Sequence, residues 1–192
     1  MTPTSAEPGD GFISIAGRLL VATPLLLEPN FYRTVIYVAE HSADGAVGLV
    51  LNRPTQEPVS AHVAEWTKYV TDPPVIYVGG PVANEIAIGM VAAPAIPPPD
   101  WSPTLGAVGL IDVALPPESL GGLEAARVFS GYSGWETGQL EQELATGSWI
   151  VTSGSAGDVF SEEPEELWGA VLRRQHDARS LYASFPADLR SN

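Results

Sequence analysis

The sequence predicts one compact domain that mixes helix and sheet. Its 192 residues are 45% hydrophobic, which suffices for a core without disulfides or structural metal. Short apolar runs rich in β-branched residues alternate with Gly- and Pro-containing turns, as strands of a sheet do. Other segments repeat apolar residues at helical spacing. We therefore expect both kinds of element in a single domain.

Eight segments are predicted to be strands. The first is a continuous apolar run that Pro24 ends, a pattern typical of a strand covered on both faces. Two similar runs follow in close succession, which indicates hairpins. The predicted strands are Arg18–Thr23, Thr34–Glu40, Ala46–Leu51, Val75–Val78, Ile86–Val91, Ala107–Ile111, Ala126–Ser130 and Trp149–Thr152.

A first helix is predicted behind Ser60, because apolar residues recur there at helical spacing and Pro73-Pro74 ends the segment. Those residues are Val59, Val63, Trp66 and Val70. The later segment 116–125 could hold a short helix.

Two late helices carry clearer end signals. Gln139–Ala145 places two leucines on one face, and Gly147 stands where a left-handed C-terminal cap belongs. The second begins after Ser161, which can cap its N-terminus. It ends near Arg173 and Arg174, whose charges suit the C-terminal end of the helix dipole.

Charge and composition exclude several classes of function. The formal charge is −14, from 23 acidic and only 9 basic residues. The basic residues are scattered, and such a charge repels polyanions, so we expect no direct binding to nucleic acid. Because the chain has no Cys, it has no thiol nucleophile, thiolate metal site or disulfide.

We expect a cytoplasmic protein. No apolar stretch approaches the roughly 20 residues of a membrane-spanning helix, so no membrane association is expected. The first residues, MTPTSAEPGDGF, do not have the pattern of a secretory signal. We expect residues 1–11 and 187–192 to be tails that flank one domain over residues 12–186.

The motifs of common active sites are absent from the sequence. It contains no Gly-Lys-Ser/Thr phosphate loop and no dinucleotide fingerprint. In GYSGW, the Gly that a nucleophile elbow needs two places after Ser133 is missing. The histidines His41, His62 and His176 lack partners at metal-ligand spacing, so we predict neither a metal nor a cofactor.

One candidate site is Phe129–Glu141 (FSGYSGWETGQLE), which lies between a predicted strand and a predicted helix. Tyr132 and Trp135 could stack on a ligand or partner, and Gln139 could hydrogen-bond to it. Backbone amides at the helix start could bind an anion. The alternative is structural: the glycines permit a tight turn and the aromatic rings fill the core.

A second candidate site lies where two strands end, at Asn52-Arg53-Pro54 and Gly79-Gly80-Pro81. If the strands are neighbours, both turns meet on one rim, where functional loops are common. Arg33 and Arg53 could bind a carboxylate or a phosphate, or could neutralise nearby acidic residues. His41 could titrate near neutral pH or simply bond to the backbone at a strand end.

Five motifs together resemble the AlgH-like (YqgE/AlgH) family in order and spacing. The match as a whole covers nearly everything from about Gly11 to Phe185, and the last motif departs from the commoner form at Glu136 and Thr137. The motifs are Gly17–Pro24 (GRLLVATP), Phe31 with Val35 and Glu40-His41, Gly45–Pro54 (GAVGLVLNRP), Val78–Val82 (VGGPV) and Gly131–Glu141 (GYSGWETGQLE).

The resemblance implies an α+β fold with a branched mixed β-sheet, a small barrel-like portion and surrounding helices. It also implies an association with transcriptional regulation of exopolysaccharide synthesis, without supplying a mechanism. The residues that we expect to contact a ligand or partner are Arg33, His41, Asn52, Arg53, Gly79, Gly80, Tyr132, Trp135, Gln139 and Glu141.

Two functional hypotheses remain open at this point. The first is a non-enzymatic cytoplasmic regulator that acts through a protein partner or a small ligand. The second is an enzyme, or a nucleotide- or metabolite-binding protein, with its site at the Asn52, Gly79 and Gln139 loops. A third, direct control of transcription through DNA, is disfavoured because no helix clusters Arg or Lys.

Overall fold

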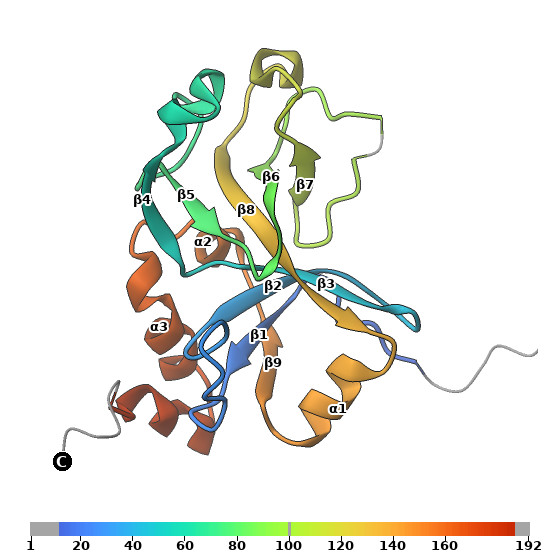
Figure 1. The fold of residues 1–192 in the computed structure, drawn as a ribbon, viewed down its shortest axis with the longest axis vertical. Coiled ribbons are helices and arrows are strands. Elements are labelled where there is room, and N and C mark those ends of the chain that lie inside the picture. The colour runs from blue at the N-terminus through green and yellow to red at the C-terminus, as the bar shows by residue number, and fades with distance from the viewer. Residues whose placement is uncertain (1–11, 100, 187–192) are drawn as a thin grey trace, which may run out of the picture.

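The computed structural model describes residues 12–99 and 101–186, and within them nine strands form one open, mixed sheet (Figure 1). The main path runs β4-β5-β8-β3-β2-β1-β9, and β6 and β7 branch from β8. The strands are β1 (Arg18–Ala22), β2 (Val35–Ser42), β3 (Gly45–Val50), β4 (Pro54–Pro58), β5 (Val75–Val78), β6 (Val82–Ala92), β7 (Val108–Asp112), β8 (Ala125–Glu136) and β9 (Trp149–Ser153).

The helices of the described residues are short. None has the length and apolar character that crossing a bilayer requires. The α-helices are α1 (Gln139–Ala145), α2 (Ala156–Val159) and α3 (Leu167–Arg173), and the 3-10 turns are η1 (Val59–Ala61), η2 (Ala64–Trp66), η3 (Pro117–Leu120), η4 (Pro164–Glu166) and η5 (Ala178–Ser184). The predicted α+β class and branched sheet are confirmed.

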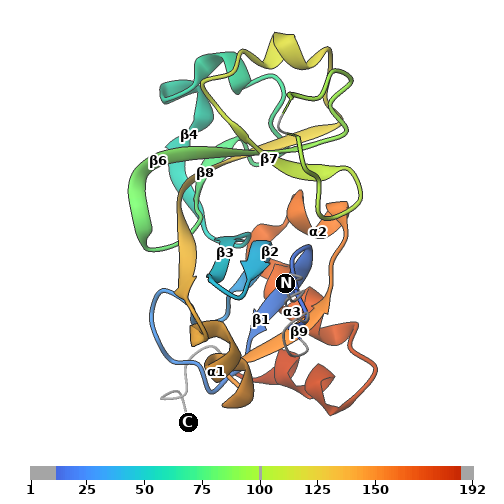
Figure 2. The ribbon, with the colours of Figure 1, turned by 90° about the vertical axis from the view of Figure 1, so that its right-hand side faces the viewer.

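Strand β8 joins the two halves of the sheet, which stand one above the other in Figure 2. Its first part lies between β5, which is parallel to it, and β6, which is antiparallel. Its last part pairs with β3, from Ser133 opposite Gly48 to Glu136 opposite Gly45. The change of partner occurs at Gly131, whose φ of 67° lies in the left-handed region.

The half of the sheet that contains β1, β2 and β3 is covered on both faces. On β2, Val35, Tyr37 and Ala39 pack with α3 in one core cluster, whereas Ile36 and Val38 pack with α1 in another. Alternate residues of a strand point to opposite faces, so both sets are apolar. This explains why β1 and β2 appear in the sequence as continuous apolar runs.

A buried arginine ties the end of α2 to the sheet. Arg127 of β8 is 1% exposed and donates to the carbonyl oxygens of Val159 (2.7 Å), Ser161 (2.7 Å) and Asp72 (3.3 Å). Its guanidinium lies 4.3 Å from the ring centroid of Tyr77. Burial lowers the pKa of Arg127, and burial raises the pKa of Tyr77 although the nearby guanidinium opposes that shift.

The predicted helix over 59–70 is wrong, because the structure has two separate 3-10 turns there. Val63 lies between them with φ −136° and ψ 70°, outside the helical region. Val59 and Trp66 are nevertheless fully buried in one cluster. The apolar spacing therefore reflects two turns that each bury one side chain, not one continuous helix.

The late helices are confirmed with one shift in position. Gln139–Ala145 forms α1 as predicted, and Gly147 has the left-handed φ of 76°. The last α-helix begins at Leu167, not after Ser161, because Pro164 starts a 3-10 turn first. The intervening α2 was not predicted; its N-terminus has a capping box between Ser155 and Asp158.

All eight predicted strands are present, but two are longer than expected and one more exists. β6 begins at Val82, and β8 continues to Glu136 through the segment that the sequence suggested was a loop. The additional strand is β4, whose PTQEP sequence has no apolar pattern. It forms because Pro54 and Pro58 pair with β5 at the edge of the sheet, where prolines are tolerated.

We expect Arg127→Met to lower the free energy of unfolding by about 3 kcal/mol, since the buried carbonyl of Val159 and the partly buried carbonyls of Asp72 and Ser161 lose a charged donor. Tyr77→Phe is the matched control. The Tyr77 hydroxyl is buried without a hydrogen-bond partner among the described residues, so its loss should change stability by less than about 0.5 kcal/mol. Urea unfolding measures both values, and equal losses would contradict the assigned role of Arg127.

We expect Gly131→Ala to lower the free energy of unfolding by about 3 kcal/mol, through left-handed backbone strain and overpacking. A Cβ there would lie 2.6 Å from both Asn84 Oδ1 and Val82 O. Gly147→Ala has similar strain (φ 76°) but open space, and should cost only about 1 kcal/mol. Similar thermal and urea midpoints for the two variants would argue against a tight crossing at Gly131.

Candidate functional site

A cleft with a volume of about 510 Å³ lies between α3, η4 and the turn after β3. We call it the arginine cleft. Three of the chain's 9 basic residues line it, although the formal charge of the chain is −14. The charged and polar residues of its wall are Arg33, Asn52, Arg53, Glu165, Glu166 and Arg173.

Arg33 is held in place by its neighbours in the fold. Its φ of 55° is unusual for a residue with a side chain, and the amide of Asn52 supports it. Asn52 Nδ2 donates to Arg33 O (2.9 Å), while Asn52 Oδ1 accepts from Val35 N (2.9 Å). Asn52 is 4% exposed, so this predicted site residue shapes the cleft and has little surface for a ligand.

The Arg33 guanidinium stacks over a fixed indole ring. Its Cζ atom lies 4.1 Å from the centroid of Trp168, and Trp168 Nε1 donates to Ala22 O (2.8 Å). A stacked guanidinium keeps the N–H groups at its edge available to other acceptors. No hydrogen bond or ion pair of the described residues uses the Arg33 guanidinium.

Arg53 is the third arginine that lines the cleft. Its Nη2 atom donates to the carbonyl oxygen of Tyr32, and burial lowers the pKa of the guanidinium. Arg53 also lines a neighbouring cleft of about 250 Å³, together with Asn30, Gly80 and Asn84. It therefore separates two hollows on the same rim.

Arg173 reaches the cleft from the last turn of α3. It folds back over Gly169, where an added Cβ would lie 3.0 Å from Arg173 Nη1. Like that of Arg33, its guanidinium makes no hydrogen bond or ion pair within the described part of the chain. Two cationic groups with unused donors thus line one hollow.

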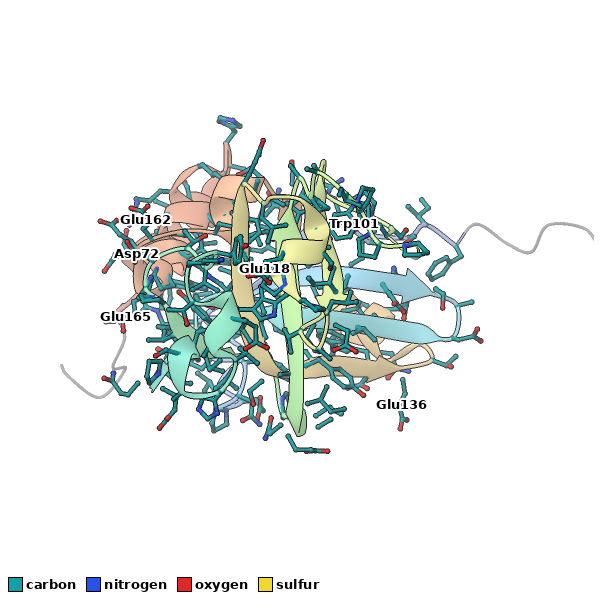
Figure 3. All side chains as sticks on the ribbon, turned by 90° about the horizontal axis from the view of Figure 1, so that it is seen from above. Asp72, Trp101, Glu118, Glu136, Glu162 and Glu165 are labelled. Atoms are coloured by element: carbon teal, nitrogen blue, oxygen red, sulfur yellow. The ribbon has the colours of Figure 1, made fainter. Side chains whose placement is uncertain are left out.

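Acidic side chains border the arginine cleft. Glu165 and Glu166 belong to its wall and also to a shallower cleft of about 360 Å³ with Glu162 and Glu163. Figure 3 shows Glu162, Glu165 and Asp72 projecting on the same side of the molecule. A ligand that reaches the arginines therefore passes carboxylates that repel anions.

The two predicted strand-end turns do meet on one rim. Val78 N donates to Arg53 O (2.9 Å), and Val50 N donates to Gly79 O (2.8 Å). Gly79 and Gly80 serve the crossing of backbones: a Cβ on Gly80 would lie 2.2 Å from the carbonyl carbon of Tyr132. Their lack of side chains is required by packing against β8.

The aromatic candidate site is occupied by the protein itself. Trp135 is 5% exposed, and its Nε1 donates to Glu143 Oε2 (2.9 Å), as does Trp149 Nε1 (2.7 Å). Gln139 Nε2 donates to the other oxygen of Glu143 (3.0 Å). Sequence reasoning missed Glu143, although its place four residues after Gln139 puts both on one helix face. Tyr132 is half-buried in the crossing.

Gln139 does not join Asn52 and Gly79 in one site. Glu136 N donates to Gln139 Oε1, and Glu136 pairs with Gly45 at the start of β3. Asn52 follows the other end of this strand. At roughly 3.4 Å per residue, the two ends of the six-residue strand are about 17 Å apart.

His41 and Glu141 meet across 100 residues of sequence, with His41 Nε2 2.9 Å from Glu141 Oε1. His41 Nδ1 accepts from Ile15 N (3.0 Å), which places the proton of the neutral ring on Nε2. The side chain is only 3% exposed. Both ring nitrogens are therefore used to join β2 to α1 and the N-terminal segment, and neither is available as a general base.

The remaining chemical candidates are structural as well. Ser133 is fully buried and donates to Gly79 O (3.1 Å), so no substrate reaches its hydroxyl. Within the described residues, no group of three His, Cys, Asp or Glu could hold a metal ion.

Known proteins match this chain along most of its length. A family model described as AlgH-like matches residues 19–179. A UPF0301 protein of Streptomyces avermitilis is 44% identical over 181 residues, which cover 91% of this chain and 94% of that protein. A UPF0301 protein of Mycobacterium tuberculosis is 40% identical over 182 residues, with 92% and 90% covered.

Two solved structures share the fold. The crystal structure of a Corynebacterium diphtheriae protein matches with a TM-score of 0.82 and 29% identity over 95% of both chains. The solution structure of AlgH from Pseudomonas aeruginosa matches with a TM-score of 0.65 and 26% identity, covering 96% of this chain and all of that one. The chain therefore belongs to the AlgH-like family.

Proposed function

We propose that this protein is a cytoplasmic, non-enzymatic regulator that binds a small organic anion in the arginine cleft. The observation that carries the proposal is the pair of guanidinium groups, Arg33 and Arg173, that line one hollow with unused donors. Arg53 adds a third positive charge to the same cleft. A phosphate or carboxylate group is the natural acceptor for such donors.

Preorganisation supports binding at this place. Asn52 fixes the backbone of Arg33, Trp168 supports its guanidinium, and Gly169 leaves room for Arg173. Positions fixed before binding reduce the entropy lost when a ligand arrives. An anion would thus meet groups that already point into the cleft.

The neighbouring glutamates restrict the kind of anion. Glu165 and Glu166 would repel a bare anion but could accept hydrogen bonds from amino or hydroxyl groups. This favours a metabolite that carries both an acidic group and hydrogen-bond donors. The overall charge of −14 disfavours a polyanion, so any effect on transcription would pass through a ligand or protein partner, without direct contact with DNA.

An enzymatic role receives less support from the geometry. The alternative site at Asn52, Gly79 and Gln139 would need Gln139 near the other two, and β3 separates them. Two of the side chains that could act as base or nucleophile, His41 and Ser133, are bonded within the fold. Binding without bond-making is therefore the function that we favour.

We expect a panel of small phosphorylated and carboxylated metabolites to contain ligands that raise the melting temperature of the protein. Arg173→Gln should weaken the best of them at least tenfold, measured by calorimetry, because one charged hydrogen bond contributes about 1.5 kcal/mol or more. Arg18→Gln is the matched control: this arginine donates to Thr152 O on β9 and is not part of the cleft.

Two results would overturn the proposal. One is a panel in which millimolar concentrations shift no melting temperature. The other is a ligand whose affinity falls equally in the Arg173 and Arg18 variants, since that would indicate general attraction of anions to positive charge. Turnover of a bound ligand would instead establish the enzymatic alternative.

A further inference from the structure

A second cleft, of about 280 Å³, opens on the other half of the sheet. We call it the apolar groove. Its floor is the sheet face formed by β5, β8 and β6, and its exposed apolar side chains are those of Val78 and Ile86. The residues that bear on its function are Glu57, Ile76, Val78, Glu85, Ile86 and Ala87.

The groove exists because the two 3-10 turns cover only part of this sheet face. Val59 and Trp66 of the two 3-10 turns bury Ile76 and Val128 in one core cluster. Farther along the same face, Val78 is 41% exposed and Ile86 is 48% exposed. Alternate residues of β5 share a face, so Ile76 and Val78 are the covered and uncovered parts of one apolar surface.

An irregular turn of β6 forms the far wall. The register with β8 shifts between Val82 and Ala87, so the residues between them project from the sheet. Ala83 has a φ of 50°, and Ser130 Oγ donates to Asn84 O, which ties the projecting segment to β8. The wall is therefore fixed to the sheet, and the groove is formed before any partner arrives.

The charges around the groove are negative. Glu57 and Glu85 belong to its wall, whereas no Lys or Arg of the described residues does. The Glu57 side chain is 66% exposed, and its Oε2 atom lies 3.4 Å from His62 Nε2. An apolar floor that two carboxylates border suits an apolar side chain with positively charged neighbours.

We propose that the apolar groove binds a short, extended segment of a partner protein in which one or two aliphatic or aromatic side chains are flanked by Lys or Arg. A volume of about 280 Å³ is at the small end of ligand pockets, which suits an anchoring side chain more than a folded domain. A second copy of this chain fits poorly, because it would bring another charge of −14 against Glu57 and Glu85. This site is separate from the arginine cleft.

The test uses three fluorescein-labelled nine-residue peptides and measures anisotropy with the full-length protein. The first carries two leucines between Lys-Arg pairs, the second replaces the basic residues by Glu, and the third replaces the leucines by Ser. We expect binding of the first alone. Its affinity should fall as salt increases, because pairing with Glu57 and Glu85 is exposed to solvent.

Variants of the protein assign the site. Val78→Thr combined with Ile86→Thr should weaken the first peptide at least tenfold, and Glu57→Gln combined with Glu85→Gln should reduce both affinity and salt dependence. Ile96→Thr is the matched control, since Ile96 is 60% exposed but does not line the groove. Arg173→Gln should leave peptide binding unchanged, so this test of the groove is independent of the test of anion binding in the arginine cleft.

Three results of the peptide assays would overturn the proposal: no binding of the first peptide at millimolar concentration, equal binding of all three peptides, or equal losses in the groove and Ile96 variants. Sedimentation supplies the remaining check. A dimer that the Val78 and Ile86 substitutions convert to monomer would show that a second copy occupies the groove, and the proposed partner would then be wrong.

Discussion

The close approach of backbones where β8 crosses from one half of the sheet to the other is the constraint on which the structure depends. Gly79 and Gly80 contact Gly131 and Tyr132 with no space for a side chain between them. Because β8 pairs with β3 only beyond this point, the crossing fixes how the two halves meet. It also fixes the turn after β3, since Arg53 O accepts from Val78 N. The position of Arg53 in the wall of the arginine cleft thus depends on the close packing of backbones at this crossing.

The two proposed surfaces differ in the physical source of their selectivity. In the arginine cleft, the net negative charge of the chain repels an anion, although a few guanidinium groups line the cleft. A small anion must therefore gain specific hydrogen bonds to these groups in order to bind. In the apolar groove, the field and the site act in the same direction, because a basic partner is attracted before its apolar side chain is buried. Selectivity in the arginine cleft therefore comes from hydrogen-bond geometry, whereas selectivity in the apolar groove begins with electrostatic attraction of the partner.

The sequence predicted the parts of the fold that depend on local hydrophobic pattern and backbone conformation. Apolar runs marked the strands, and the chemistry of Gly147 marked the end of α1. The predictions were wrong where tertiary contacts determine the local structure. Val59 and Trp66 have helical spacing, but two separate turns bury them. Likewise, the glycines near Gly131 suggested a loop, although pairing with β3 keeps the chain extended.

The candidate site shows the same division. Ends of neighbouring strands predicted that Arg53 and Gly79 would meet, and they do. Arg173 was interpreted only as the end of a helix, because no pattern in the sequence says that α3 packs beside Arg33. Trp135 looked available for a ligand because its partner, Glu143, belongs to an element whose docking the sequence does not specify.

The carboxylate shared by Trp135 and Trp149 has a consequence for how this protein can vary. Helix α1 has seven residues, too few to be stable in isolation, so its attachment to the sheet must come from contacts such as these. One position on the helix satisfies two indoles from two strands. Losing Glu143 alone would remove the acceptor of both indole N–H groups at once, so a substitution to a residue without an acceptor should be costly here while both tryptophans remain.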